Sequence, residues 1–237
     1  MIIEQCDYPT CLVEPGISKL FYFYRLSRLL PHQYYMSVLE EVYRDGDVLI
    51  GGIGAKLLGA DWVGLHDLDI VTDRPGCLGE CVERGERHAV SVYRGVVVRH
   101  YCWCDVSLRR DDVVKVGRFL VASRESTVAW WLRRTLSFAF GRSDSAELEE
   151  IWRYRAPKAL AELVYMYLTW GGLDMAKVRS YLAMDRRYAT FVESLPTSAL
   201  ARQACAILYD HFGYSVRTCL DDVARFVASI SPVPVRE

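Results

Sequence analysis

The sequence predicts an α+β protein, in which a small mixed β-sheet flanked by helices is followed by a C-terminal helical domain. Before residue 112, apolar residues recur in several short runs with the period of two that is typical of strands. Beyond residue 112, they recur with a period near 3.6, the period of an α-helix. We therefore expect two domains, residues 1–111 and residues 112–237.

The first domain is expected to begin with two helices. Residues 17–30 form an apolar and aromatic stretch that ends before Pro31. Residues 32–44 repeat apolar side chains at helical spacing. The face that these side chains share consists of Tyr35, Val38, Leu39 and Val42.

Short strands and helices are expected to follow. The predicted strands are 48–50, 65–72, 89–93 and 96–108, and the predicted helices are 53–59 and 77–87. The last two strands should pair as a hairpin, because the tight turn Arg94-Gly95 joins them. The helices predicted for the second domain are 124–140, 145–169, 175–184, 198–212 and 218–229.

The composition is that of an ordinary globular protein, with 51% hydrophobic and 25% charged residues. The chain has no run of about 18 uncharged apolar residues, so we expect no membrane-spanning segment. Its first seven residues lack the basic and apolar regions of a signal peptide, so we expect a cytoplasmic protein. Residues 1–111 carry 12 basic and 16 acidic side chains, whereas residues 112–237 carry 17 and 14. The more basic half either faces a phosphate-rich substrate or is a solvated helical surface.

Eight cysteines are many for a cytoplasmic chain. Closely spaced pairs such as Cys77/Cys81 lack the C-x-x-C spacing of a zinc site, so zinc is not indicated. Cys102 and Cys104 lie on an expected strand and should point into the core as small apolar groups. Internal disulfides would be compatible with a hyperthermophilic source.

Two acidic residues stand one position apart in His66-Asp67-Leu68-Asp69-Ile70-Val71. In a strand, Asp67 and Asp69 project from one face, whereas the residues between and after them project from the other. Two carboxylates at this distance repel each other, and a fold tolerates them most readily when a cation sits between them. Ligation by oxygen alone suits Mg²⁺ or Mn²⁺. His66 is either a further ligand or base, or a hydrogen-bonded histidine at the strand edge.

A glycine turn and a third acid accompany this pair. Gly51-Gly52 follows the short strand 48–50, and Asp105 lies at the end of a long apolar strand expected beside Asp67 and Asp69. Three carboxylates on adjacent strands would bind two divalent ions, which serve in-line nucleotidyl transfer.

This order of features resembles the DNA polymerase β-like nucleotidyltransferase superfamily. Its members share a Gly-Gly or Gly-Ser turn, a spacer, Asp-x-Asp and a later Asp, places taken here by Gly51-Gly52, Asp67/Asp69 and Asp105. Residues 51–59 are similar to the Gly-Gly-x-Ala-x-x-Leu-x-Gly run of the small stand-alone bacterial and archaeal branch. That branch includes abortive-infection-type toxins and minimal nucleotidyltransferases. The spacer between glycines and acids, 14 residues, is at the long end of the family's range.

The resemblance implies a palm-like domain and an Mg²⁺- or Mn²⁺-dependent enzyme that uses two ions. Such an enzyme moves an NMP from an NTP, such as ATP, to a hydroxyl acceptor in a tRNA, a protein or a small molecule. A toxin-like member would also have an antitoxin partner. Asp67 and Asp69 would hold both metals, and Asp105 would complete the site and help to deprotonate the acceptor. Gly51 and Gly52 would let backbone amides approach the β- and γ-phosphates.

Three alternatives accompany this interpretation. Lys56 either contacts phosphate or is an ordinary solvated lysine. Trp130-Trp131, with Trp152 and Trp170, either stack on a base or pack in a helical core. The whole chain is either an active enzyme or a catalytically inactive module that keeps the fold to bind a nucleotide or a partner.

Overall fold

The computed structural model describes residues 29–103, 108–140, 146–182 and 192–231. The chain divides into two compact units, Met1–Ser123 and Arg124–Glu237, which we describe separately. The helix predicted at 17–30 lies almost wholly outside the described residues, as do Asp105 and Cys104. Within the described ranges, no helix has both the length and the apolar character needed to cross a bilayer.

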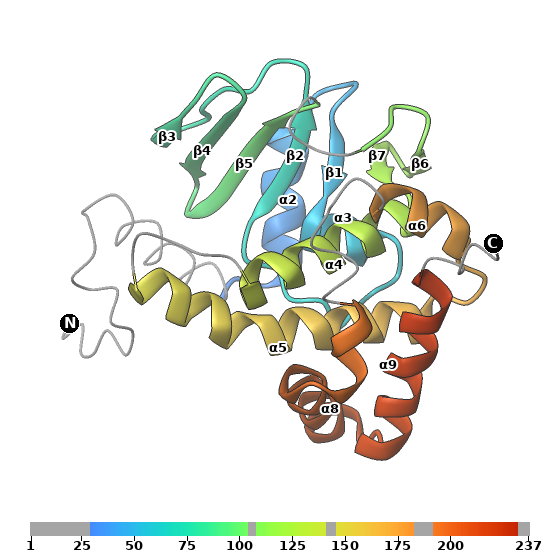
Figure 1. The fold of residues 1–237 in the computed structure, drawn as a ribbon. Helices are drawn as coiled ribbons and strands as arrows, with labels where there is room; N and C mark the ends of the chain where they lie inside the picture. Colours follow the sequence, from blue (N-terminus) through green and yellow to red (C-terminus); the bar gives the residue numbers. More distant parts are fainter. Residues whose placement is uncertain (1–28, 104–107, 141–145, 183–191, 232–237) are drawn as a thin grey trace. The chain divides into compact units, whose positions relative to one another are not determined.

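A seven-stranded mixed sheet forms the first unit (Figure 1). Its strands are β1 (Val48–Ile50), β2 (Leu68–Thr72), β3 (Glu80–Arg84), β4 (His88–Tyr93), β5 (Val96–Cys102), β6 (Val113–Val116) and β7 (Phe119–Ala122). Their spatial order is β3-β4-β5-β2-β1-β7-β6. β2 lies at the centre, antiparallel to β1 and parallel to β5. Together with the helices of both units, this sheet confirms the predicted α+β class.

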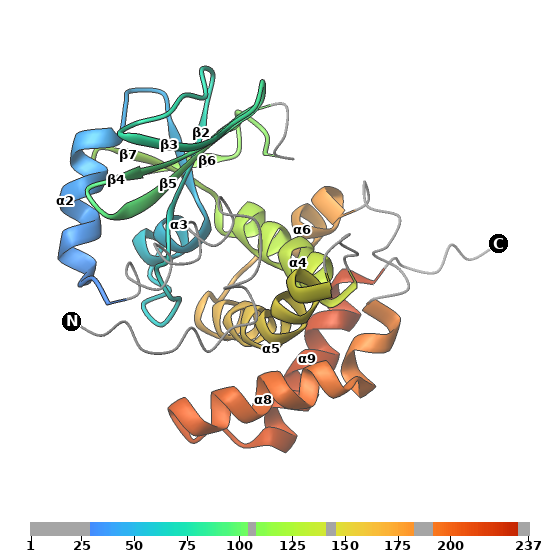
Figure 2. The same cartoon turned by 90° about the vertical axis from the view of Figure 1, so that its left-hand side faces the viewer.

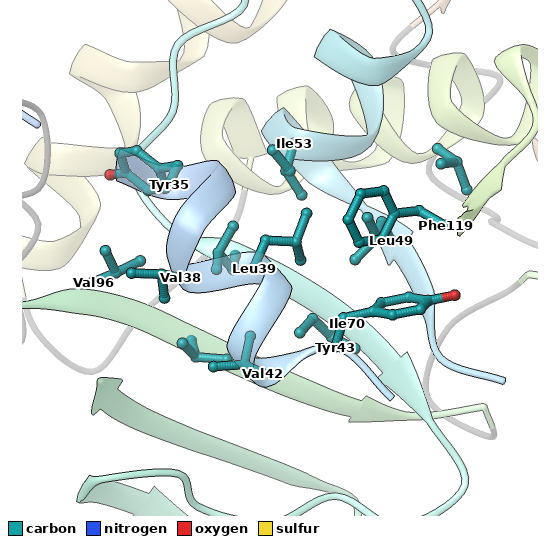
Figure 3. Packing of buried hydrophobic residues seen from close by; sticks show 13 residues of the cluster. Tyr35, Val38, Leu39, Val42, Tyr43, Leu49, Ile53, Ile70, Val96 and Phe119 are labelled. Carbon is teal, nitrogen blue, oxygen red and sulfur yellow. The ribbon is translucent and has the colours of Figure 1, made fainter. Parts of the chain in front are cut away.

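Helix α2 (His32–Val42) lies against one face of the sheet, as Figure 3 shows. Its buried residues are the four that the sequence predicts, Tyr35, Val38, Leu39 and Val42. They join one core cluster with Leu49 of β1, Ile53, and apolar residues of β2, β5 and β7. Helical spacing therefore predicts this face correctly, because one side of the helix is buried against the sheet.

Alternation along β2 separates its apolar and acidic residues. Leu68 and Ile70 belong to the core cluster beneath α2, so Asp69 projects from the opposite face of the sheet. The parallel register pairs Leu68 with Val98 and Asp69 with Arg99. A slip of one residue would turn the carboxylate into the core, so the buried face fixes this register.

Helix α3 (Gly51–Leu57) follows β1 without a connecting loop. It begins two residues earlier than the predicted helix 53–59, because Gly51 itself, at φ +66°, turns the chain out of the strand. β2 begins at Leu68, later than the predicted start at 65. Asp67 therefore lies immediately before the strand.

The helix predicted at 77–87 is wrong, because this segment contains strand β3. β3 pairs antiparallel with β4, with an irregularity between Cys81 and Glu83. A disulfide joins Cys77 to Cys81. The segment is a strand because it pairs with β4, and such pairing is not visible in the local periodicity of the sequence.

Residues 112–123, which the sequence assigns to the helical domain, instead contain two strands. Strands β6 and β7 form a hairpin that turns at Gly117, and β7 pairs in parallel with β1. Phe119 and Val121 are buried in the core of the first unit. The division between the units consequently falls after Ser123, whereas the sequence places it after residue 111.

The predicted hairpin of β4 and β5 is confirmed. Its turn residues Arg94 and Gly95 both have positive φ, 51° and 78°, as a type I′ turn requires. β5 ends at Cys102, opposite Thr72 of β2, and does not extend through 108 as predicted. Cys102 is half-buried.

The second unit is helical, and its five main helices lie within two residues of their predicted limits (Figure 2). They are α4 (Arg124–Phe140), α5 (Ala146–Thr169), α6 (Met175–Leu182), α8 (Ala199–Phe212) and α9 (Val216–Ile230), with a 3₁₀ turn at Leu195–Thr197. Trp131 and Trp170 are buried, so the prediction of core packing is confirmed for these two side chains. A disulfide between Cys205 and Cys219 joins α8 to α9.

Candidate functional site

The acid pair is buried on the face of β2 opposite α2. Asp67 is 5% exposed and Asp69 is 1% exposed. Two ionised carboxylates removed from water are costly unless hydrogen bonds or cations compensate their charge. The groups around the pair therefore define what this site can bind.

The glycine turn lies directly against this pair. A Cβ atom added to Gly51 would lie 2.2 Å from Oδ2 of Asp69, much closer than atoms can approach. The left-handed backbone at Gly51 also disfavours any residue with a side chain. A Cβ on Gly52 would lie 2.7 Å from the carbonyl oxygen of Gly64. The structure thus brings together the glycines and the Asp69 carboxylate, which are separate motifs in the sequence.

Helix α3 begins at Gly51, beside Asp69, and its first backbone N–H groups lack partners within the helix. Ile50 precedes the helix and provides no capping side chain for these N–H groups. Lys56 lies in the last turn of α3, and its ammonium donates a hydrogen bond to the carbonyl oxygen of Asp61. In this structure, the lysine holds the turn that follows the helix.

Strand β5 contributes a cation to the site. Arg99 is the register partner of Asp69, so the two side chains project from the same face of the sheet. Its Nε atom lies 3.6 Å from Oδ2 of Asp67. The guanidinium thus forms an ion pair with one member of the acid pair while standing beside the other.

Tyr101, two residues further along β5, contributes a hydroxyl. It donates a hydrogen bond of 3.2 Å to Oδ1 of Asp69 and accepts one of 3.5 Å from Nη1 of Arg99. Burial raises the pKa of Tyr101 well above its usual range, and the negative charge of Asp69 adds to this effect. The phenol is therefore neutral at physiological pH and acts as a donor to the carboxylate.

The third predicted acid, Asp105, lies outside the described residues, so its position relative to the pair is not part of this geometry. The β5 positions that share a face with Asp69 beside the pair are Arg99 and Tyr101. Among the described residues, no group of three acidic, histidine or cysteine side chains is placed to hold a metal ion.

The donor chemistry of the described pair nevertheless fits one kind of ion. Mg²⁺ is usually bound by one or two carboxylates, with water and substrate phosphates completing its octahedral shell. Asp67 and Asp69 supply two buried carboxylates with hard oxygen donors. The pair fits a magnesium ion that arrives with a phosphorylated ligand better than a site made of protein ligands alone.

Sequence reasoning did not identify Arg99 or Tyr101. The sequence does contain one indication of the role of Arg99, because this charged residue interrupts the apolar strand after Val97 and Val98. Arginine is seldom buried in a strand unless an acid lies opposite. The parallel register that brings it beside Asp69 is a property of the tertiary fold.

Two histidines near β2 and β5 belong to different surroundings. His66 lies in the bend before Asp67 and is half-buried. His100 lies on the core face of β5, where its Nδ1 atom is 2.6 Å from the carbonyl oxygen of Gly76. Burial lowers the pKa of His100, so the ring is neutral and donates this hydrogen bond.

Comparisons of the chain with models of protein families, with curated proteins and with solved structures found no match.

Proposed function

We propose that the protein is a metal-dependent nucleotidyltransferase, which moves an NMP from an NTP to a hydroxyl acceptor. One observation carries this proposal: the Asp69 carboxylate lies so close to Gly51 that any other residue there would collide with it. The glycine turn and one buried carboxylate of the pair thus lie side by side, which supports a palm-like nucleotidyltransferase domain. The antiparallel β1 and the parallel β5 on either side of β2 are consistent with such a domain.

The proposed roles follow from the chemistry of each group. Backbone N–H groups of Gly51 and Gly52, at the start of α3, would bind the β- and γ-phosphates, because hydrogen-bond donors at a helix N-terminus favour anions. Asp67 and Asp69 would hold Mg²⁺ or Mn²⁺. When bound, the two ions of such a site neutralise phosphate charge and acidify the attacking hydroxyl.

Asp105 is proposed as the base that accepts the proton of the acceptor hydroxyl. Tyr101 and Arg99 orient Asp69 and Asp67, respectively, through the contacts described above. Lys56 would serve phosphate only if it left the Asp61 carbonyl. The acceptor is a tRNA, a protein or a small molecule, and a toxin-like enzyme acting on tRNA or protein would need an antitoxin partner.

The direct test is transfer of label from each α-labelled NTP, with Mg²⁺ or Mn²⁺, to total tRNA or to lysate protein. We expect label in one acceptor fraction for the parent protein and none for Asp67→Asn/Asp69→Asn. Asp61→Asn removes an exposed carboxylate from the same unit and should retain transfer. Equal labelling by the parent and the double variant would refute the proposed chemistry.

Arg99 favours a second candidate function, an inactive module that binds a nucleotide or a partner. A guanidinium beside Asp67 offsets one of the two negative charges of the pair without any metal, as a protein that no longer uses metal would require. In that case no NTP would label any acceptor with either metal. A fluorescent NTP would still bind, and its affinity would be the same with and without the two aspartates.

A further inference from the structure

The acid pair carries its own cation within the sheet. Arg99 stands opposite Asp69 in the parallel register of β2 and β5, and its Nε atom lies 3.6 Å from Oδ2 of Asp67. The Arg99 side chain is 29% exposed, against 7% for that of Asp67. In this ion pair, the Arg99 guanidinium is therefore more accessible to solvent than the Asp67 carboxylate.

Tyr101 connects this cation to the second acid. Arg99 donates to the phenol oxygen, and the phenol donates in turn to Oδ1 of Asp69. The same two side chains thus serve both carboxylates. By themselves, Asp67, Asp69 and Arg99 have two acidic groups and one permanent cation, so ionisation of both acids gives these three side chains an excess negative charge.

The distance of 3.6 Å between Nε of Arg99 and Oδ2 of Asp67 is longer than that of a charge-assisted hydrogen bond. At this distance the guanidinium offsets the negative charge of Asp67. A divalent ion that enters between the acids would be repelled by the guanidinium and would have to displace it.

We propose that Arg99 is a built-in counter-cation of the Asp67–Asp69 pair, which stabilises the metal-free fold and competes with divalent ions for the carboxylates. A metal that arrives with a nucleoside triphosphate also brings phosphate oxygens, which bind a displaced guanidinium well. Arg99 thereby makes the site select the metal–nucleotide complex over the free ion. This inference rests on the proposed function, because it takes the acid pair as a metal site.

The test is calorimetric titration of the metal-free protein with Mn²⁺ alone. We expect Arg99→Gln to bind Mn²⁺ at least about tenfold more tightly than the parent, a difference of about 1.4 kcal/mol. The matched control is Arg118→Gln, which removes the same charge from an exposed ion pair with Glu40 in the same unit. It should bind Mn²⁺ as the parent does. Repeating the titration with a non-hydrolysable ATP analogue should reduce or reverse the advantage of Arg99→Gln.

The outcomes separate the two proposals. Equal Mn²⁺ affinity of the parent and Arg99→Gln would overturn the role of Arg99 and leave the proposed function standing. Failure of the parent and Arg99→Gln to bind Mn²⁺, with or without the analogue, would overturn the proposed function and this inference with it.

A second measurement covers the case in which Arg99→Gln does not fold. In ¹⁵N NMR spectra of the parent, the Nε–H resonance of Arg99 is identified by its absence from Arg99→Lys. Addition of Mg²⁺ with the ATP analogue should shift this resonance as the guanidinium leaves Asp67. An unchanged resonance under conditions in which the complex binds would overturn the inference.

Discussion

Both units of the protein bury carboxylates, but they compensate them differently. In the helical unit, Asp222 of α9 is 3% exposed and accepts hydrogen bonds from the Tyr214 hydroxyl and from Arg225. In the sheet unit, Asp67 and Asp69 share one arginine and one tyrosine. Taken by themselves, Asp222 and Arg225 balance each other's charge, whereas Asp67 and Asp69 together with Arg99 keep a negative charge. We propose that the first arrangement supports the fold and that the second binds a divalent ion, which displaces the guanidinium.

The largest effect is expected from Gly51→Ala, which tests whether the turn and the acids form one site. Collision with Asp69 and the left-handed backbone should together lower the free energy of unfolding by about 3 kcal/mol. Gly46→Ala is the matched control, because Gly46 also has positive φ but has open space where its Cβ would lie. It should cost only about 1 kcal/mol, the backbone contribution. Equal losses in urea denaturation would show that Asp69 does not crowd the turn.

Replacing a buried aspartate by asparagine should change the free energy of unfolding differently in the two units. Asp222→Asn should lower the free energy of unfolding by about 2 kcal/mol, because two hydrogen bonds lose their charged acceptor. Asp69→Asn should leave the metal-free protein as stable as the parent or more stable. The amide oxygen still accepts from Tyr101, and the repulsion from Asp67 is removed. A loss for Asp69→Asn as large as that for Asp222→Asn would mean that the acid pair is purely structural.

Alkaline pH should weaken the helical unit through Tyr214. Burial, followed by the hydrogen bond to Asp222, raises the pKa of Tyr214 to about 12, against 10.0 for an ordinary tyrosine. Folding therefore favours the protonated phenol, and its contribution is complete below about pH 10 and is lost as the pH rises toward about 12. Thermal unfolding of Tyr214→Phe should show a smaller alkaline decline than the parent. Tyr209→Phe, at an exposed position of α8, should decline as the parent does.

A smaller pH effect is expected in the sheet unit on the acid side. Burial lowers the pKa of His100 below 6.5, so the folded protein favours the neutral ring. Its stabilising contribution is complete above about pH 6.5 and is lost as the pH falls through the lowered pKa, because the unfolded chain takes up the proton first. His100→Gln should reduce the decline in melting temperature below about pH 6.5. If the melting temperatures of the parent and His100→Gln fell equally, the decline would arise from groups other than His100.

The sequence predicts the helical unit better than the sheet, and the reason is physical. Helical periodicity is local, so α4 and the buried face of α2 can be recognised from spacing alone. β3, β6 and β7 depend on pairing with strands distant in the chain, and their local pattern is ambiguous.

The same limit applies within the site. Asp67, Asp69 and Gly51 form recognisable motifs, whereas Arg99 and Tyr101 become their neighbours only through the register of β5 on β2. An arginine inside an apolar strand is the one local sign of that register. Where a buried strand carries an acid, a cation on a neighbouring strand is thus worth seeking.

The most direct test of the central claim is Mn²⁺ binding by the protein in the presence of a non-hydrolysable ATP analogue, compared with Asp67→Asn/Asp69→Asn. Electron paramagnetic resonance of Mn²⁺ measures the bound fraction without requiring any acceptor. We expect saturable binding by the parent and a dissociation constant at least about tenfold higher for the double variant, a loss of about 1.4 kcal/mol. Identical binding by the two proteins would contradict a cation site at these aspartates.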